Sequence, residues 1–591
     1  MTEPIPATMK SLPKLLQLPD ELLDSIISQL VTPTDTVYFG LTCRRTHNLV
    51  RASPVWRRHC LSTWQYWTPR HDLPAKLARP PLHTDWRQLY IERIRIDRKA
   101  AGLFEALLLS QQHRAQRMQE IAAGGRDVQD LLLRLKDGTP DEAEDVLARR
   151  WHAEAILGMV HRTAAIATWW RLRRDREVSL EEALCAFDLF LLAADRVELV
   201  GDVKAELDRI AECVRGTTDV FEELSTRQRA LRIAEYLVSQ GLVGNPDTAN
   251  YHALRNNFIS IALFSEEHTS LPLQSVAIYC AVAKRLGVDA KPSNVPGHVL
   301  AVVTAPVGQS LDGGPMDASD SVERMHMDPW RQTQEITEDE LSLRLLHAGI
   351  PPYQHHFYIS GADTLEMILR TSRNILRSVE GIRFGTPSQL DTEAAQYSAA
   401  WAMFILGDNN PALATMQRLQ CWDFLLEKFH TYFPHDSALV TENMLPMLEN
   451  LAEHHHVSEV LERMQEEDRV QKVQKLREAN DSGVQFRIGH YFNHKRYGYR
   501  GFIVGWDPQC AAGQAWIMRM GVDELPRGRE QPFYNIVCMD RSRRYVAEEN
   551  IEPLNERPPL DMLRLGGQFF KRWGDEEGKF VSNICDEYPD D

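Results

Sequence analysis

Four residues in the middle of the chain have the side chains that acyl chemistry requires. They are His298, Asp328, Ser275 and Cys280, the last two within an apolar stretch. A histidine can remove the proton of a hydroxyl or thiol nucleophile while a carboxylate orients the histidine ring. The chemistry open to such a set is acyl hydrolysis or transfer, with Ser275 as nucleophile, or Cys280 after a shift of its helix.

A helix and a strand, joined by a turn, would position these residues. Leu273–Leu286 has the composition of a compact buried helix, and Gly287 follows it, as is common where a helix ends. Pro296-Gly297-His298 then leads into the apolar strand Val299–Val303. The expected order is therefore helix, turn and strand, with His298 just before the strand.

This order resembles the SirB-like branch of the transglutaminase-like superfamily, over about 179–375. The matching motifs are Asn256-Asn257-Phe258, Pro272-Leu273-Gln274-Ser275, Arg285-Leu286-Gly287 and Pro296-Gly297-His298. The resemblance implies that His298 is the family histidine and that Asp328 is the family aspartate. The family cysteine, at the start of the helix, would fall near Pro272 or Leu273.

Neither Pro272 nor Leu273 has a nucleophilic side chain. The start of a helix lowers the pKa of a thiol, but Cys280 lies about two turns further along the apolar helix. We therefore expect no cysteine-nucleophile catalysis and a degenerate site. His298 and Asp328 are then vestigial, serving either the structure or a binding groove inherited from an enzyme.

The stretch 18–30, LPDELLDSIISQL, predicts an amphipathic helix. Pro19 suits the first turn, where a missing N–H costs nothing, and Asp20 and Glu21 suit the positive end of the helix dipole. The apolar stripe of this helix comprises Leu22, Leu23, Ile26, Ile27 and Leu30. A second apolar helix over 37–49 and then Trp56 follow.

A unit of this size is marginal as a free-standing fold, and an exposed apolar face on it favours a partner helix. The unit resembles an F-box, the module that connects a protein to a ubiquitin-ligase scaffold. The alternative is an ordinary amphipathic hairpin packed on the body of the protein. The resemblance implies docking on the Skp adaptor through Leu18, Pro19, Leu22, Ile26, Leu30, Leu41 and Trp56.

After Val484 the apolar spacing becomes strand-like, and glycines interrupt aromatic and β-branched runs, as is typical of a tightly bent small barrel. This block resembles the YccV domain, also called the hemimethylated-DNA-binding or HspQ-like domain. The matching residues are Gly489, 494–501, 506–508, 531–534 and 545–550.

The binding residues implied for this block are Lys495, Arg496, Tyr497, Tyr499, Arg500 and Trp506. Basic side chains between aromatic ones suit a phosphate backbone or stacked bases. Residues 484–553 carry ten Lys and Arg against eight Asp and Glu, a weak electrostatic footprint for nucleic acid. Recognition of a substrate peptide is therefore favoured, and DNA binding is the alternative.

Composition limits the remaining classes. The 591 residues carry a net charge of −16, which argues against a nucleic-acid binder along the whole chain. Nine scattered cysteines without a CxxC pair indicate reduced thiols, and no apolar run suits a signal peptide or a membrane span. A cytoplasmic or nuclear protein is expected. We expect no metal or other cofactor, because His355-His356, His454-His455-His456 and the pair His490 and His494 lack ligand geometry.

The expected fold is multidomain and mainly α with α+β parts. It comprises a helical F-box (13–60), a helical linker (61–178), an α-rich transglutaminase-like core with a small sheet (179–375), a helical spacer (376–483), a small β-barrel (484–556) and a partly disordered acidic tail (557–591).

The resemblances together imply the substrate-recognition subunit of a Skp–cullin–F-box ubiquitin ligase. Its partners would be the Skp adaptor, the cullin scaffold and an unknown protein substrate. The rival interpretations are an acyl-transfer or hydrolytic enzyme at the His298 groove, and a DNA-binding or chromatin-associated protein acting through residues 484–556.

Overall fold

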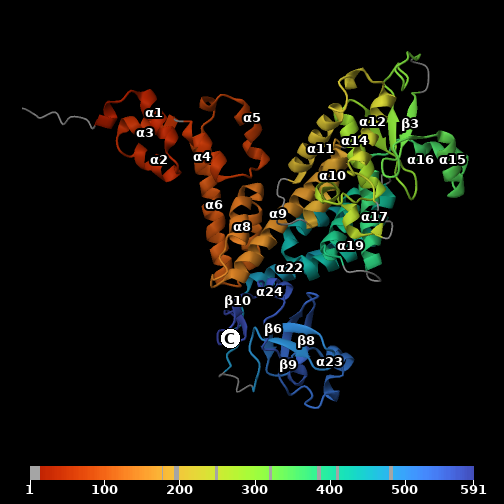
Figure 1. The fold of residues 1–591 in the computed structure, drawn as a ribbon. Coiled ribbons are helices and arrows are strands. Elements are labelled where there is room, and N and C mark those ends of the chain that lie inside the picture. Colours follow the sequence, from red (N-terminus) through yellow and green to blue (C-terminus); the bar gives the residue numbers. More distant parts are fainter. Residues whose placement is uncertain are drawn as a thin grey trace, which may run out of the picture. The chain divides into compact units, whose positions relative to one another are not determined.

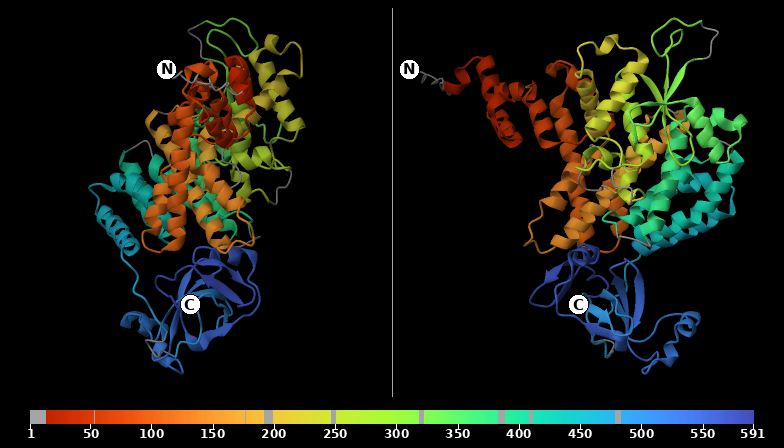
Figure 2. Two further views of the ribbon diagram at one scale, coloured as in Figure 1. Left: turned by 90° about the vertical axis from the view of Figure 1, so that its left-hand side faces the viewer. Right: turned by 45° about the vertical axis from the view of Figure 1, so that its right-hand side comes forward.

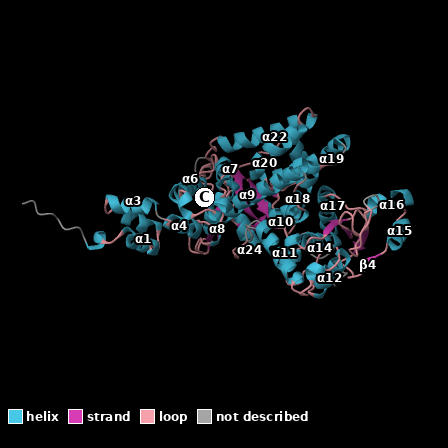
Figure 3. Ribbon diagram, turned by 90° about the horizontal axis from the view of Figure 1, so that it is seen from above, coloured by secondary structure: helices cyan, strands magenta, loops and turns pink. Residues whose placement is uncertain are grey.

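The computed structural model describes residues 14–52, 54–175, 177–191, 199–245, 250–317, 322–382, 388–407, 411–477 and 483–591. The chain divides into two compact units. The first comprises Met1–Ile156, Gln471–Tyr491 and Leu554–Asp591, and the second Leu157–Val470 and Phe492–Pro553. Helices predominate and the sheets are small (Figure 3), which confirms the expected multidomain, mainly helical fold with α+β parts.

The first unit begins with short helices and continues with longer ones (Figure 1). They are α1 (Asp20–Gln29), α2 (Pro33–Gly40), α3 (Arg44–Ala52), α4 (Val55–Thr63), α5 (Leu73–Ala78), α6 (Trp86–Leu109), α7 (Arg114–Ala122), α8 (Gln129–Asp137) and the first part of α9 (Val146–Asp175).

The second helix expected over 37–49 is two helices, α2 and α3. Thr32 caps α2 by accepting a hydrogen bond from the amide of Asp35, 3.0 Å away. Cys43 and Thr46 exchange side-chain and backbone hydrogen bonds at the start of α3, which resembles a capping box. One helix therefore ends at Gly40 and a second begins at Arg44, where the sequence had predicted a single helix.

The acidic tail differs from the expectation of partial disorder. Residues 557–591 contain α24 (Leu560–Gly566) and a hairpin of β10 (Phe570–Gly574) and β11 (Lys579–Ser582). The Asp591 carboxylate accepts two hydrogen bonds from the Arg477 guanidinium, at 2.5 and 3.0 Å. Acidic composition alone suggested disorder, but a buried hairpin and this ion pair tie the segment into the first unit.

The second unit surrounds one helix that is buried on all sides. Its helices are α10 (Leu180–Leu191), α11 (Leu199–Arg215), α12 (Thr226–Ser239), α13 (Ile259–Phe264), α14 (Pro272–Arg285), α15 (Glu338–His347), α16 (Pro352–Ile359), α17 (Thr364–Ile382), α18 (Thr392–Leu406), α19 (Pro411–Tyr432), α20 (Ser437–Leu439), α21 (Leu445–Leu448), α22 (Ala452–Arg469) and α23 (Gln514–Met520). Every residue from Pro272 to Ala283 of α14 is buried, among α10, α11, α12 and α13 (Figure 1).

A four-stranded antiparallel sheet packs beside α14. Its strands lie in the order β1 (Asp289–Pro292), β2 (Ala301–Thr304), β3 (Arg324–Met327) and β4 (Glu335–Ile336). Ala301 pairs with Met327 and Thr304 with Arg324, so the entry to β2 and the exit from β3 lie at the same end of the sheet.

The helices expected to form a spacer are part of this same core. Trp401 and Phe404 of α18, Phe429 of α19 and Val457 of α22 are buried in one hydrophobic cluster with α14. These helices have apolar residues at helical spacing, and only the charged stretch 459–480 was expected to space the next domain away from the core. Their apolar faces instead cover the transglutaminase-like region.

The expected C-terminal barrel is a five-stranded sheet in the order β8 (Arg543–Ala547), β7 (Phe533–Cys538), β6 (Arg500–Asp507), β5 (Tyr491–His494) and β9 (Ile551–Pro553), drawn in blue in Figure 2. The β6–β7 register shifts between Ile503 and Gly505, which bends the pair. The stretch 514–520, expected to be strand-like, is helix α23.

A buried ion pair joins α9 to the turn before α20. The Arg162 guanidinium donates two hydrogen bonds to Asp436, at 2.6 and 2.8 Å, and both side chains are buried. Asp436→Ala should lower the free energy of unfolding by about 3–5 kcal/mol, because it leaves a buried charge without its partner. Urea unfolding followed by tryptophan fluorescence measures the change.

The control for this prediction is Arg232→Ala, which breaks the exposed pair Arg232–Glu235. Exposed pairs contribute about 0–1 kcal/mol, so the control should unfold nearly as the wild type does. Equal stability of the Asp436 and Arg232 variants would contradict a structural role for the buried pair.

Candidate functional site

The predicted apolar stripe of α1 divides into a buried and an exposed part. Leu23 and Ile27 are fully buried, whereas the Leu22 side chain is exposed by 51%. Leu18, Ile26 and Leu30 are half-buried, and Pro19 is exposed. Part of the predicted adaptor-binding set is therefore open to a partner, and part belongs to the core of this small helical unit.

Exposed apolar side chains also gather on and after α2. Leu41 is 69% exposed, and Tyr38 and Val37, which were not among the predicted binding residues, are exposed too. Trp56 is different, because its side chain is buried and its Nε1–H donates to the carbonyl oxygen of Val50 at 2.8 Å. The structure thus assigns Trp56 a packing position, since its large apolar ring fills the core of the unit.

Arg45 of α3 holds the start of α1. Its guanidinium donates to Asp20 Oδ1 at 2.5 and 2.8 Å and to the carbonyl oxygen of Leu18 at 2.7 Å. These bonds fix the backbone at Leu18 and Pro19, the first two residues of the predicted docking motif. Sequence reasoning missed Arg45, because nothing in its local pattern indicates contact with a residue so far back in the chain.

The sheet register brings His298 and Asp328 together. His298 lies just before β2 and Asp328 directly follows β3, at the sheet end where Ala301 faces Met327. His298 Nε2 lies 2.9 Å from Asp328 Oδ1, and both side chains are largely covered. The Trp330 ring lies edge-on to the imidazole, 5.5 Å between centroids. A histidine oriented by a carboxylate is the arrangement that the sequence predicted.

Of the two nucleophile candidates, Ser275 is hydrogen-bonded within the core and Cys280 is buried in it. Ser275 is fully buried, its Oγ accepts a hydrogen bond from the Gly244 amide at 3.0 Å, and Ser270 Oγ lies 2.7 Å away. Burial raises the pKa of Cys280 well above its usual value. Within the described residues, neither side chain forms a hydrogen bond to His298.

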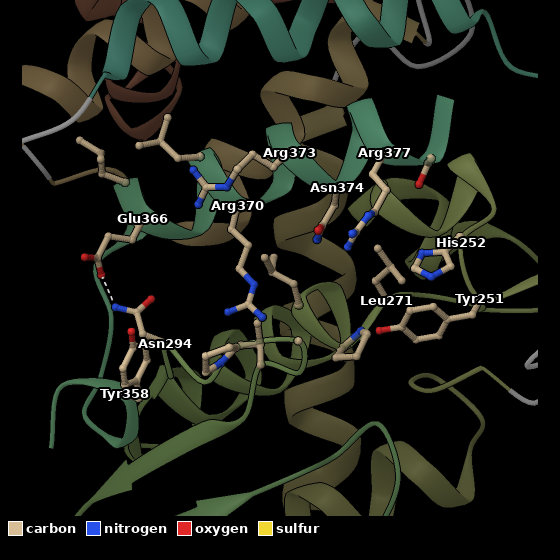
Figure 4. Close-up of a pocket in the computed structure, with 18 of the residues that line it drawn as sticks. Tyr251, His252, Leu271, Asn294, Tyr358, Glu366, Arg370, Arg373, Asn374 and Arg377 are labelled. Carbon is tan, nitrogen blue, oxygen red and sulfur yellow. Dashed lines mark hydrogen bonds between the residues drawn. The ribbon is translucent and has the colours of Figure 1, made fainter. Parts of the chain in front are cut away.

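A cavity of about 740 Å³ opens beside the start of α14 (Figure 4). Leu271, Pro272 and Leu273 form one wall, so the positions implied for the family cysteine face this space. Pro296 and Gly297, directly before His298, form part of a second wall. The cavity has the size of a small-molecule or peptide-side-chain site.

The C-terminal sheet carries a stack of aromatic and guanidinium groups, exposed at Arg496 and Tyr497 and half-buried at Tyr499 and Arg544. The Tyr497 and Tyr499 rings lie nearly parallel, 8° between planes and 6.4 Å between centroids. The Arg496 guanidinium lies 5.4 Å from the Tyr497 ring and that of Arg544 lies 4.1 Å from the Tyr499 ring. Such cation–π contacts pre-order a flat surface that suits a planar or anionic group.

Other residues predicted for this surface lie elsewhere. Trp506 is fully buried in the core beneath the sheet. Other residues of this chain cover its side chain, so it is not part of the exposed surface. Lys495 Nζ donates to the carbonyl oxygen of Glu549 at 3.0 Å, which holds the loop, and Arg500 is exposed. Arg544 was not among the binding residues implied by the sequence, because its stacking on Tyr499 depends on the pairing of β6, β7 and β8.

Neither a metal-binding cluster nor a membrane-spanning helix is present in the part of the chain that the structure describes. No group of three or more His, Cys, Asp or Glu side chains there is arranged to hold a metal ion. Among those same residues, no helix is both long and apolar enough to cross a membrane.

Three family models match separate stretches of the chain. Residues 15–62 match the F-box-like model, residues 201–373 the transglutaminase-like superfamily, and residues 484–577 the model of hemimethylated DNA-binding protein YccV like. All three resemblances predicted from the motifs are confirmed. No solved structure gives a significant match.

Similarity to whole proteins extends over most of the chain. F-box only protein 21 of Mus musculus and that of Homo sapiens are each 24% identical to it, over 91% of this chain and 86% of the relative. The Pongo abelii protein of the same name matches to the same extent. The chain resembles F-box only protein 21. This similarity and the F-box-like region support a substrate-recognition role in a ubiquitin ligase.

Cys280 should be unreactive in the folded protein. Iodoacetamide should label the exposed Cys585 within minutes at neutral pH, whereas Cys280 should be labelled only after denaturation. The reason is that burial both blocks access and raises the pKa of the Cys280 thiol, and only a thiolate reacts. Peptide mass spectrometry measures both sites in one sample, and labelling of native Cys280 as fast as Cys585 would contradict the prediction.

Proposed function

We propose that this protein is the substrate-recognition subunit of a Skp–cullin–F-box ubiquitin ligase. The observation that carries the proposal is the F-box-like region with exposed apolar side chains on α1 and α2, in a chain that resembles F-box only protein 21 along most of its length. An exposed apolar face on a small helical unit is the surface that a partner helix covers.

The mechanism is one of proximity. The F-box-like unit docks on the Skp adaptor, and through it on the cullin. The transglutaminase-like region and the C-terminal sheet hold the substrate, so that its lysines lie near the ubiquitin-charged enzyme. Local concentration and orientation supply the gain in rate, and the receptor needs no reacting side chain of its own.

The transglutaminase-like site is proposed to be degenerate. Pro272 and Leu273 occupy the positions implied for the cysteine, Ser275 is held by Gly244 and Ser270, and Cys280 is enclosed. The bond between His298 and Asp328 then serves to shape the turn beside the cavity.

Adaptor capture tests the proposal. A pull-down with the full chain should recover the Skp adaptor and cullin, and Leu22→Glu/Leu41→Glu should reduce the recovery roughly tenfold or more, because each charge would be buried on docking. The matched control is Leu82→Glu/Leu109→Glu, which adds the same charges at leucines of the same unit that are still more exposed.

Two results would contradict the proposal: no capture by folded wild-type protein, or capture unaffected by the Leu22 and Leu41 substitutions but lost in the control. Circular dichroism of each variant separates loss of docking from loss of fold.

We further propose that the stack around Tyr497 and Tyr499 contacts substrate protein, with DNA as the competing ligand. Wild-type full-length protein and Lys495→Glu/Arg496→Glu should give the same weak, salt-sensitive anisotropy change with duplex DNA, because the region carries almost balanced charge. Arg519→Glu, on α23 of the same sheet region, is the control. Duplex binding that persists at physiological salt and is lost only in the Lys495 and Arg496 variant would instead favour the DNA reader.

A further inference from the structure

The wall of the cavity opposite α14 is formed by one helix and carries three arginines. Arg370, Arg373 and Arg377 of α17 are spaced at i, i+3 and i+7, which places them on one helix face. Over seven residues the helix rises about 10 Å, so the three positions form a row along the cavity. Figure 4 shows Arg370 extending from α17 into the space between Asn294 and Leu271, with Arg377 beside Asn374.

None of these three guanidinium groups is paired with a carboxylate from the described part of the chain, although most arginines of the second unit's surface helices are. Partial burial lowers the pKa of Arg370 and of Arg373. By surface area Arg370 is half-buried, whereas Arg373 and Arg377 are exposed. The neighbouring guanidinium of Arg373 lowers the pKa of Arg370 further. Three like charges along one cavity wall repel one another unless an anion lies between them.

The acidic residue of the cavity does not serve this purpose. Glu366 Oε2 accepts a hydrogen bond from Asn294 Nδ2 at 2.8 Å and from the Asp363 amide at 3.3 Å (Figure 4). These bonds hold Glu366 at the end of the cavity formed by Asn294, away from Arg377 (Figure 4). The other polar groups that line the space, among them Asn374, His252 and Tyr251, are neutral or able to donate hydrogen bonds.

Hydrogen bonds fix the helix that carries the arginines to the rest of the cavity. Asn257 Nδ2 donates to Ser378 Oγ of α17 at 3.0 Å and to the carbonyl oxygen of Leu254 at 3.1 Å. Gln274 Nε2 of α14 donates to the carbonyl oxygen of Asn257 at 2.8 Å. Asn257 therefore ties α17 to α14 and sets the distance between the arginine wall and the apolar wall.

We propose that this cavity binds an acidic segment of the substrate polypeptide, with two or more Asp or Glu carboxylates paired to Arg370, Arg373 and Arg377 and an apolar side chain against Leu271–Leu273. A guanidinium pairs with a carboxylate through two parallel hydrogen bonds. Separate guanidinium groups spread along a helix match separate carboxylates better than one compact phosphate. The inference rests on the proposed function, because it names the substrate chemistry that the receptor recognises.

A random peptide library displayed on phage tests the inference with the full-length protein as bait. Peptides selected by the wild type should be enriched in paired Asp or Glu residues next to a large apolar residue. The variant Arg370→Gln/Arg373→Gln/Arg377→Gln should select no such peptides. The most enriched peptide, labelled with fluorescein, should bind the triple variant at least roughly tenfold more weakly than the wild type in anisotropy titrations.

The matched control is Arg209→Gln/Arg215→Gln/Arg232→Gln. It removes the same charge from α11 and α12 of the same unit, at exposed arginines that are each paired with a glutamate. Its affinity for the peptide should equal that of the wild type. A triple lysine variant of the cavity arginines should show intermediate affinity, because it keeps the charge and loses the paired hydrogen bonds.

Adaptor capture on the same preparations separates the two proposals. If the triple glutamine variant still captures the Skp adaptor and has lost the acidic peptide, both stand. If the wild type captures the adaptor and selects no acidic peptide, the inference is overturned and the receptor role stands. Displacement of the labelled peptide by inorganic phosphate as effectively as by unlabelled peptide, at matched ionic strength, would also overturn it in favour of a compact anion.

Discussion

The burial of α14 on every side is the constraint on which the second unit depends. Packing covers the side chains along the length of such a helix, so they cannot contact a substrate. Only residues at the two ends of the helix can do so. Residues from Pro272 to Ala283 are all buried, so Cys280 is enclosed and Ser275 is held by backbone and hydroxyl groups. The start of the helix borders the cavity, whereas its last turn reaches solvent at Lys284.

The other walls of the cavity follow from how the chain packs around that helix. The β2–β3 register brings His298 to Asp328 at the sheet end nearest the turn of Pro296 and Gly297. Asn257, from a motif that the sequence already singled out, ties α17 to α14 through Ser378 and Gln274. The start of α14 and the turn before β2 thus border one cavity, and the charged residues that line it lie on the opposite helix, α17.

The recognition surfaces proposed for this chain consist of side chains that the fold leaves at least partly open. They are the exposed leucines Leu22 and Leu41, the stacked tyrosines of the C-terminal sheet and the arginines of α17. A catalytic centre needs a few groups at fixed short distances. A receptor needs separate surfaces for the adaptor and the substrate. This chain has exposed side chains in its F-box-like, transglutaminase-like and YccV-like regions.

The sequence by itself determined the three family resemblances, the mainly helical multidomain class and the pairing of His298 with Asp328, because local motifs and apolar periodicity carry that information. Only the tertiary structure decided which apolar and charged residues are available. Trp56 and Trp506 have the composition of binding residues, yet both are buried, because an aromatic ring is equally suited to a core and to an interface. The acidic tail is ordered through Arg477, far from it in the chain. The arginines of α17 were not singled out from the sequence, because helical spacing says only that they share a face. The tertiary structure shows that this face lines a cavity, opposite the start of α14.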